Sequence, residues 1–136
     1  MVAGGHVMEV PKDSTYSSVV SLRSMRIVMF LTELNGMNLG AGDVGNAYLT
    51  AYTSEQVYTI AGPEFGELAG HTLVIEKALY GLKSSGARFH DSFADSMRIL
   101  GWIPSKADPD VWMKDCTDRW EYVCTWVDDL LYGGLN

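Results

Sequence analysis

The chain has 136 residues, 47% of them apolar, which is enough to form the hydrophobic core of one domain or of part of one. Its 17 acidic and 10 basic residues give a net charge of −7. This argues against nucleic-acid binding by this stretch alone, because affinity for phosphate backbones comes largely from Lys and Arg. The two cysteines and three histidines lack zinc-site spacing, no apolar run is long enough to span a membrane, and no signal-peptide pattern is present.

The first predicted element is a helix over residues 21–34, with Ser21 as its N-cap and Asn35-Gly36 as its end. Arg23 and Arg26 are expected on its solvated side. The packing face is expected to comprise Leu22, Met25, Val28, Met29 and Thr32.

Residues 40–49 predict a strand that ends at Asp43-Val44, followed by a tight bend and a short helix. Asp43 is a single acidic residue in an apolar, glycine-rich context, where a carboxylate is costly to bury without a partner or a metal. Residue type alone favours a core position for Tyr48.

The middle of the chain predicts a short strand or helical turn over residues 55–60, a loop over 62–67 and a strand over 71–77. Residues 80–86 do not match a phosphate-binding loop. A helix over residues 86–100 then follows, ended by Gly101. Its core stripe is expected to comprise Phe89, Phe93, Met97 and Leu100.

The last third predicts a strand over residues 107–114, a turn over 115–119 and a strand from Trp120 that leads into a hairpin bent at Asp128 and Asp129. Turn chemistry alone explains such a pair of aspartates in most proteins. Together with Asp43, however, they could hold two divalent cations, the arrangement that clamps a phosphoryl displacement. Cys116 and Cys124 could face each other across a hairpin, although reduced thiols are expected inside cells.

Five blocks of the chain resemble, in order, the reverse transcriptase of copia-type LTR retrotransposon polyproteins. Trp126-Val127-Asp128-Asp129-Leu130-Leu131 is similar to the family's Tyr-Val-Asp-Asp signature, and residues 43–49 are similar to its first catalytic motif. The other blocks are residues 15–20, Ala78-Leu79-Tyr80-Gly81-Leu82-Lys83 and Ala107-Asp108-Pro109-Asp110-Val111-Trp112. The resemblance covers nearly the whole chain.

The resemblance implies an α+β fold like that of a polymerase palm, in which helices pack on one face of an antiparallel sheet. The domain is expected to be truncated. Residues 1–136 would be a single partial reverse transcriptase domain, with about 1–35 on the fingers side and 36–136 forming the palm with its catalytic hairpin. Thumb, RNase H and integrase regions would lie elsewhere in the polyprotein. The parent would be intracellular, in cytoplasmic virus-like particles, without a membrane.

The resemblance also implies a two-metal site for nucleotidyl transfer from a deoxynucleoside triphosphate to an RNA- or DNA-templated primer. Two Mg²⁺ or Mn²⁺ ions would be bound by Asp43, Asp128, Asp129 and the Val44 carbonyl, the three aspartates being the catalytic residues. The residues implied near the nucleotide are Tyr48, Tyr80, Gly81 and Lys83. Those implied near the primer terminus are Trp126 and Val127.

Two departures from the family pattern support a different hypothesis. Trp126 stands where the family has Tyr, and Gly4 stands where it often has Arg. The alternative is a catalytically inactive retrotransposon remnant that acts at most as a folded or partner-binding α+β module. Another palm-type nucleotidyl transferase, such as a cyclase, is a third alternative, although its nucleotide-site motifs are missing. Even as a polymerase, this stretch alone is expected to be weak or inactive.

Overall fold

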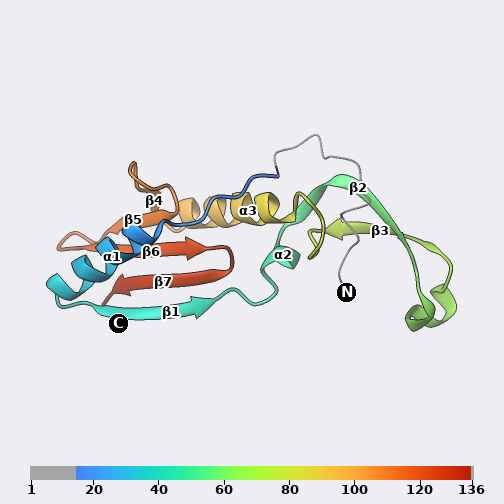
Figure 1. The fold of residues 1–136 in the computed structure, drawn as a ribbon, viewed down its shortest axis with the longest axis horizontal. Coiled ribbons are helices and arrows are strands. Elements are labelled where there is room, and N and C mark those ends of the chain that lie inside the picture. Colours follow the sequence, from blue (N-terminus) through green and yellow to red (C-terminus); the bar gives the residue numbers. More distant parts are fainter. Residues whose placement is uncertain (1–14, 136) are drawn as a thin grey trace. The chain divides into compact units, whose positions relative to one another are not determined.

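The computed structural model of the chain describes residues 15–135 (Figure 1). These residues form two compact units. The first, which we call the sheet unit, comprises residues 17–45 and 90–135. The second, which we call the hairpin unit, comprises residues 15–16 and 46–89. The predicted division into a fingers-side segment and a palm stays a prediction.

The sheet unit is built on one antiparallel sheet of five strands in the order β1-β7-β6-β5-β4. Strand β1, early in the chain, pairs with β7 at its end, so the sheet joins segments that are far apart in sequence (Figure 1). The strands are β1 (Asn38–Asp43), β4 (Ile103–Pro104), β5 (Val111–Asp115), β6 (Trp120–Trp126) and β7 (Asp129–Gly134).

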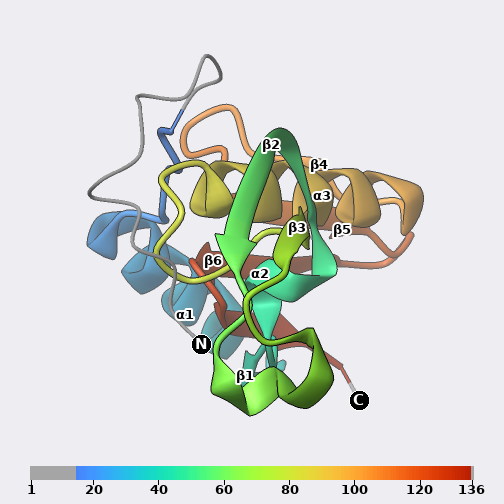
Figure 2. The ribbon, with the colours of Figure 1, turned by 90° about the vertical axis from the view of Figure 1, so that its right-hand side faces the viewer.

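Two helices cover opposite faces of this sheet (Figure 2). Val28 of α1 (Leu22–Leu34) packs with Val111 and Cys124. Met97 of α3 (Ser85–Ile99) packs with Trp112 and Val123. Because neighbouring residues of a strand point to opposite faces, the adjacent apolar pairs in β5 and β6 give the sheet two buried faces. The predicted α+β class with an antiparallel sheet is confirmed, but the prediction that the helices cover one face is wrong.

The predicted limits of α1 are confirmed, and its packing face is confirmed in part, at Met25, Val28 and Thr32. The Ser21 hydroxyl oxygen accepts a hydrogen bond from the Ser24 backbone N–H at 3.2 Å, as expected of an N-cap. Val28 and Thr32 are buried, whereas Leu22 and Met29, which were expected to pack, are 60% and 45% exposed. Only the stripe that faces the sheet is covered, and it is narrower than the apolar arc of this helix.

The core stripe of α3 is confirmed except at its last member. Phe89 and Met97 are buried and Phe93 is half-buried. Leu100 is exposed, because α3 ends at Ile99 and the chain turns away through Gly101, whose φ is +84°.

The hairpin unit contains α2 (Ala47–Thr50) and an antiparallel pair of strands, β2 (Tyr52–Ile60) and β3 (Thr72–Lys77). The predicted strand over residues 71–77 is confirmed, and the segment left open between strand and helical turn is a strand. The predicted loop over residues 62–67 is instead a short 3₁₀ helix, η2 (Pro63–Leu68), which begins at a proline as such helices often do.

Cys116 is a half-buried free thiol and Cys124 is a buried one. Burial, together with the charge of Asp108, raises the pKa of the Cys124 thiol to about 11. Across residues 15–135, no helix has the length and hydrophobicity needed to cross a membrane.

Candidate active site

The pairing of β1 with β7 brings the predicted catalytic aspartates together from the two ends of the chain. Asp43 is the cross-strand partner of Asp129. The Val44 backbone N–H donates a hydrogen bond to the Asp128 carbonyl oxygen at 2.8 Å, which fixes the end of β1 against the hairpin. All of these residues belong to the sheet unit, so one sheet positions them.

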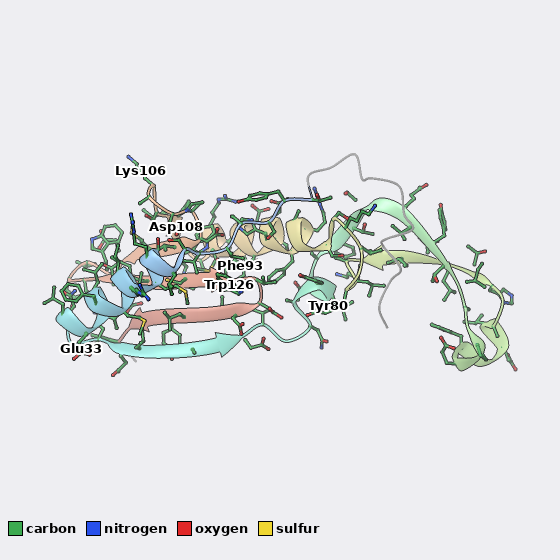
Figure 3. The ribbon with its side chains drawn as sticks, in the orientation of Figure 1. Glu33, Tyr80, Phe93, Lys106, Asp108 and Trp126 are labelled. Atoms are coloured by element: carbon green, nitrogen blue, oxygen red, sulfur yellow. The ribbon has the colours of Figure 1, made fainter. Side chains whose placement is uncertain are left out.

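The hairpin turn lies one residue earlier in the chain than the sequence suggested. Trp126 and Asp129 are paired across the hairpin, which leaves Val127 and Asp128 as a two-residue loop. Asp128 is therefore in the bend as predicted, whereas Asp129 is the first residue of β7. Figure 3 shows Trp126 at the end of β6, next to this turn.

Val127 adopts a left-handed backbone conformation with φ of +56°. This is rare for a β-branched side chain and costs of order 1–3 kcal/mol where the surrounding structure enforces it. Here the Trp126–Asp129 pair and the Val44–Asp128 hydrogen bond hold the turn on two sides. Strained residues cluster at functional sites, but Thr117, in the turn between β5 and β6, has a φ of +75° as well.

Asp43 and Asp129 are exposed, and Asp128 is half-buried. Side chains of directly opposed residues share one face of a sheet, where two like charges repel each other. A divalent cation would relieve this repulsion, and carboxylate oxygens are the ligands that Mg²⁺ prefers. Within residues 15–135, however, no three Asp, Glu, His or Cys side chains form a group that could hold a metal ion. The register thus sets Asp43 beside Asp129 but does not gather the predicted three carboxylates into one ligand set. Two carboxylates suit a Mg²⁺ ion whose remaining ligands are substrate phosphates and water.

The residues implied near the nucleotide lie in the hairpin unit. The rings of Tyr48 and Tyr80 are in contact, with centroids 4.5 Å apart, and the Phe89 ring lies 6.1 Å from that of Tyr48. Gly81 has a φ of +99°, a conformation that glycine adopts most easily. Lys83 is half-buried in the same turn. The structure thus brings Tyr48 to Tyr80, and Gly81 and Lys83 follow Tyr80 within three residues of the chain.

A pair of ionisable side chains that no local sequence pattern indicates lies behind the Asp-Asp hairpin, with one of its two members buried. His90 Nε2 and Asp110 Oδ1 are 2.7 Å apart, and Asp110 is 1% exposed. The Asp110 carbonyl accepts hydrogen bonds from the backbone N–H and the hydroxyl of Thr125, at 3.0 and 3.3 Å. The Thr125 carbonyl in turn accepts one from the Val20 N–H at 3.0 Å. The β6 residue directly before Trp126 is therefore fixed on both sides.

Asp108 ties the start of α1 to the turn before β5 (Figure 3). Its carboxylate accepts hydrogen bonds from the backbone N–H groups of Ser21 and Asp110, at 3.0 and 3.2 Å. Burial by itself raises the pKa of this carboxyl. The hydrogen bonds from the Ser24 and Ser21 hydroxyls and from these N–H groups outweigh that effect, so the pKa lies below its usual value.

The fold and the site together define an α+β protein. In it, the β6–β7 hairpin with its two aspartates lies beside β1, which ends at Asp43. Comparison with known proteins gives the family. The family described as "Reverse transcriptase (RNA-dependent DNA polymerase)" matches residues 1–136. The chain therefore belongs to the reverse transcriptase family, as the resemblance predicted.

Its relatives are polyproteins of plant copia-type transposons. The chain is 28% identical over 128 residues to the retrovirus-related Pol polyprotein from transposon TNT 1-94 of Nicotiana tabacum, covering 91% of this chain and 10% of the relative. It is 26% and 25% identical over 122 residues to those from transposons RE1 and RE2 of Arabidopsis thaliana, covering 88% of this chain and 8% of each relative. No solved structure matches the chain. The chain thus spans about a tenth of these relatives or less.

Proposed function

We propose that this chain is the catalytic palm segment of an RNA-directed DNA polymerase encoded by a copia-type retrotransposon. The observation that carries the proposal is the register of β1 and β7, which sets Asp43 opposite Asp129 at the hairpin that holds Asp128. Membership in the reverse transcriptase family supports the same site. The whole activity belongs to a larger polyprotein, of which this stretch is a small part.

In this proposal the reaction is the attack of a primer 3′-hydroxyl on the α-phosphate of a deoxynucleoside triphosphate, with pyrophosphate leaving. Asp43, Asp128 and the Val44 carbonyl would be ligands of two Mg²⁺ or Mn²⁺ ions, and Asp129 would contribute negative charge beside them. The bound ions would lower the pKa of the hydroxyl and neutralise charge on the phosphates. The strained turn at Val127 would hold the Asp128 carboxylate toward the reacting groups, and Trp126 would lie near the primer terminus.

The family resemblance assigns the contacts with the nucleotide to residues of the hairpin unit. Tyr48, supported by the ring of Tyr80, presents an aromatic surface suited to packing under a sugar. Gly81 would allow close approach of the backbone, and Lys83 would contribute positive charge toward a phosphate. Most of the basic surface that binds the RNA or DNA template-primer would come from other parts of the polyprotein, and the reaction would take place in cytoplasmic virus-like particles.

The second candidate function is a catalytically inactive remnant that persists as a folded or partner-binding module. The observations that favour it are the net charge of −7 and the replacement of the family Tyr by Trp126. The larger indole would crowd the primer terminus if it lies where the family places this residue.

Primer extension on an RNA template, with Mg²⁺ or Mn²⁺, tests the proposal directly. Asp128→Asn should abolish extension while the circular dichroism spectrum stays unchanged, because the substitution removes a ligand charge and leaves the turn in place. Asp118→Asn, at a carboxylate that is 71% exposed in another turn, is the matched control and should extend primers like the unmodified chain. Equal extension by both variants would refute the assigned site. A folded chain that extends nothing, alone or within the longer polyprotein, would support the remnant.

A further inference from the structure

The outer side of α1 carries an apolar surface that the sheet unit leaves uncovered. The exposed fractions of its large apolar residues lie between 45 and 67%. These residues are Leu22, Ile27, Met29, Phe30 and Leu34. Three of them, Ile27, Phe30 and Leu34, lie within about 60° of one another around the helix axis. Apolar residues gathered in this way typically mark an interaction site, whereas single exposed apolar residues do not.

Helical geometry groups six exposed residues into one stripe, which we call the α1 outer face. At 3.6 residues per turn, all six lie within about 60° of Phe30 around the helix axis. Val28 and Thr32, which are buried against the sheet, lie on the other side. The α1 outer face comprises Arg23, Arg26, Ile27, Phe30, Glu33 and Leu34.

The N-terminal half of this surface is hollowed. A shallow depression of about 340 Å³ is lined by Leu22, Arg23, Arg26, Ile27 and Phe30. The C-terminal half carries Glu33 and Leu34 instead; Figure 3 shows Glu33 at that end of α1. One half is thus a basic hollow, and the other is an acidic and apolar projection.

We propose that the α1 outer face is a self-complementary interface, through which two copies of this chain pair with their α1 helices antiparallel. A two-fold axis near Val28, the midpoint of α1, would place the C-terminal half of each helix over the N-terminal half of the other. Glu33 of one copy then lies beside the first turns of the other copy, within reach of Arg23 and Arg26. Leu34 enters the depression, and Phe30 packs at the centre.

The charges on this face favour a second copy as the occupant. The chain as a whole carries −7, so two copies repel each other over most of their surface. The α1 outer face differs, because it offers two arginines to each incoming glutamate and the symmetry forms every contact twice. A single pair of short helices buries little surface, below the roughly 1,200 Å² of stable complexes, so a weak dimer is expected.

Sedimentation velocity over a concentration series tests this dimer. The unmodified chain should shift from monomer to dimer as its concentration rises. Phe30→Glu should keep it monomeric at every concentration. Ile99→Glu replaces a residue that is 85% exposed at the end of α3 and serves as the matched control, which should still dimerise. Circular dichroism of each variant verifies folding.

Exchanging the charges at positions 26 and 33 distinguishes specific pairing through the α1 outer face from non-specific association. Glu33→Arg alone should weaken dimerisation about tenfold, because it replaces four attractive contacts by four repulsive ones, and Arg26→Glu alone should weaken it less, because it changes two. The double variant should bind more tightly than Glu33→Arg alone, because the new Glu at position 26 attracts the new Arg at position 33 while Arg23 still repels it. A chain that stays monomeric throughout, a dimer that Phe30→Glu leaves intact, or a double variant no better than Glu33→Arg alone would overturn the proposal.

Discussion

The two units of this chain bury their apolar residues to very different extents. In the sheet unit, large side chains such as Trp112 and Val123 are buried, and the sheet is covered on both faces. In the hairpin unit, the apolar residues of β2 and β3 stay largely exposed, with Tyr52 at 68% and Ile60 at 65%. A two-stranded sheet without a core is marginally stable. The sheet unit should therefore fold by itself, whereas the hairpin unit should gain stability from what it binds.

This contrast matches the roles proposed for the two units. Two-metal chemistry requires carboxylates held in fixed positions, and Asp43, Asp128 and Asp129 lie on the well-packed sheet. Residues that close around a nucleotide are commonly drawn from the less stable parts of a structure. Tyr48 and Tyr80 lie in the unit with the smaller core.

The largest expected effect comes from removing the central side chain of the sheet unit. Trp112→Ala should lower the free energy of unfolding by about 3–5 kcal/mol, because Trp112 is 2% exposed and its loss leaves a cavity against α3. Ile60→Ala in the hairpin unit should change it by less than about 0.5 kcal/mol. Urea unfolding followed by circular dichroism measures both. Equal losses would mean that the two units share one core.

Two glycine substitutions, one in each unit, test the same contrast with a smaller loss of stability. A Cβ added at Gly133 in β7 would overlap the Thr32 hydroxyl of α1, and Thr32 is buried with its hydroxyl bonded to the Val28 carbonyl at 2.8 Å. Gly133→Ala should therefore destabilise the sheet unit by about 1–3 kcal/mol. Gly62→Ala in the hairpin unit meets only the flexible carboxylate of Glu64 and should be nearly neutral in the same assay. A neutral Gly133→Ala would show that α1 moves freely on the sheet.

Protonation of Asp108 at acid pH should lower the stability of the sheet unit. The pKa of this carboxyl is lower in the folded chain than the usual 3.8, so folding favours its charged form. The resulting stabilisation is complete above the unfolded pKa and is lost as the pH falls through the folded pKa. Asp108→Asn should cost about 1–2 kcal/mol at pH 7 and progressively less below pH 4. A difference between the two proteins that is constant from pH 7 to pH 2.5 would contradict this assignment.

Local sequence features predicted most helices and strands of this fold, but not how these elements pack against one another. Periodicity and turn residues located α1, α3 and the hairpin at Asp128, because these signals depend on neighbouring residues. The sequence did not show that both faces of the sheet are buried. Consecutive apolar residues such as Val111 and Trp112 are compatible with a strand buried on one face or on both. Periodicity alone also could not show that the apolar arc of α1 is wider than the sheet covers.

Some features of the candidate site could likewise be predicted from the sequence, whereas others could not. The resemblance of short blocks predicted that Asp43 would meet the Asp-Asp hairpin, and the β1–β7 register bears out their proximity. The His90–Asp110 pair was missed, because it joins a helix to a turn 20 residues later and nothing local marks it. The Asp-Pro-Asp sequence before β5 was the available signal. The conformation of Val127 could not be predicted either, since a β-branched residue disfavours it and only the surrounding pairs impose it.

Val127 offers the smallest and most specific test of the contrast between the units. Val127→Gly should raise the free energy of unfolding by up to about 1 kcal/mol, because glycine adopts a positive φ without the clash that valine suffers. Tyr58→Gly, at an exposed position within β2, should not stabilise the chain, because glycine in a strand interior loses entropy and gains nothing. If the strain serves to hold Asp128 toward the reacting groups, Val127→Gly should also lower primer extension while the fold becomes more stable. A variant that gains stability and keeps full extension would show that the strain is incidental to the proposed chemistry.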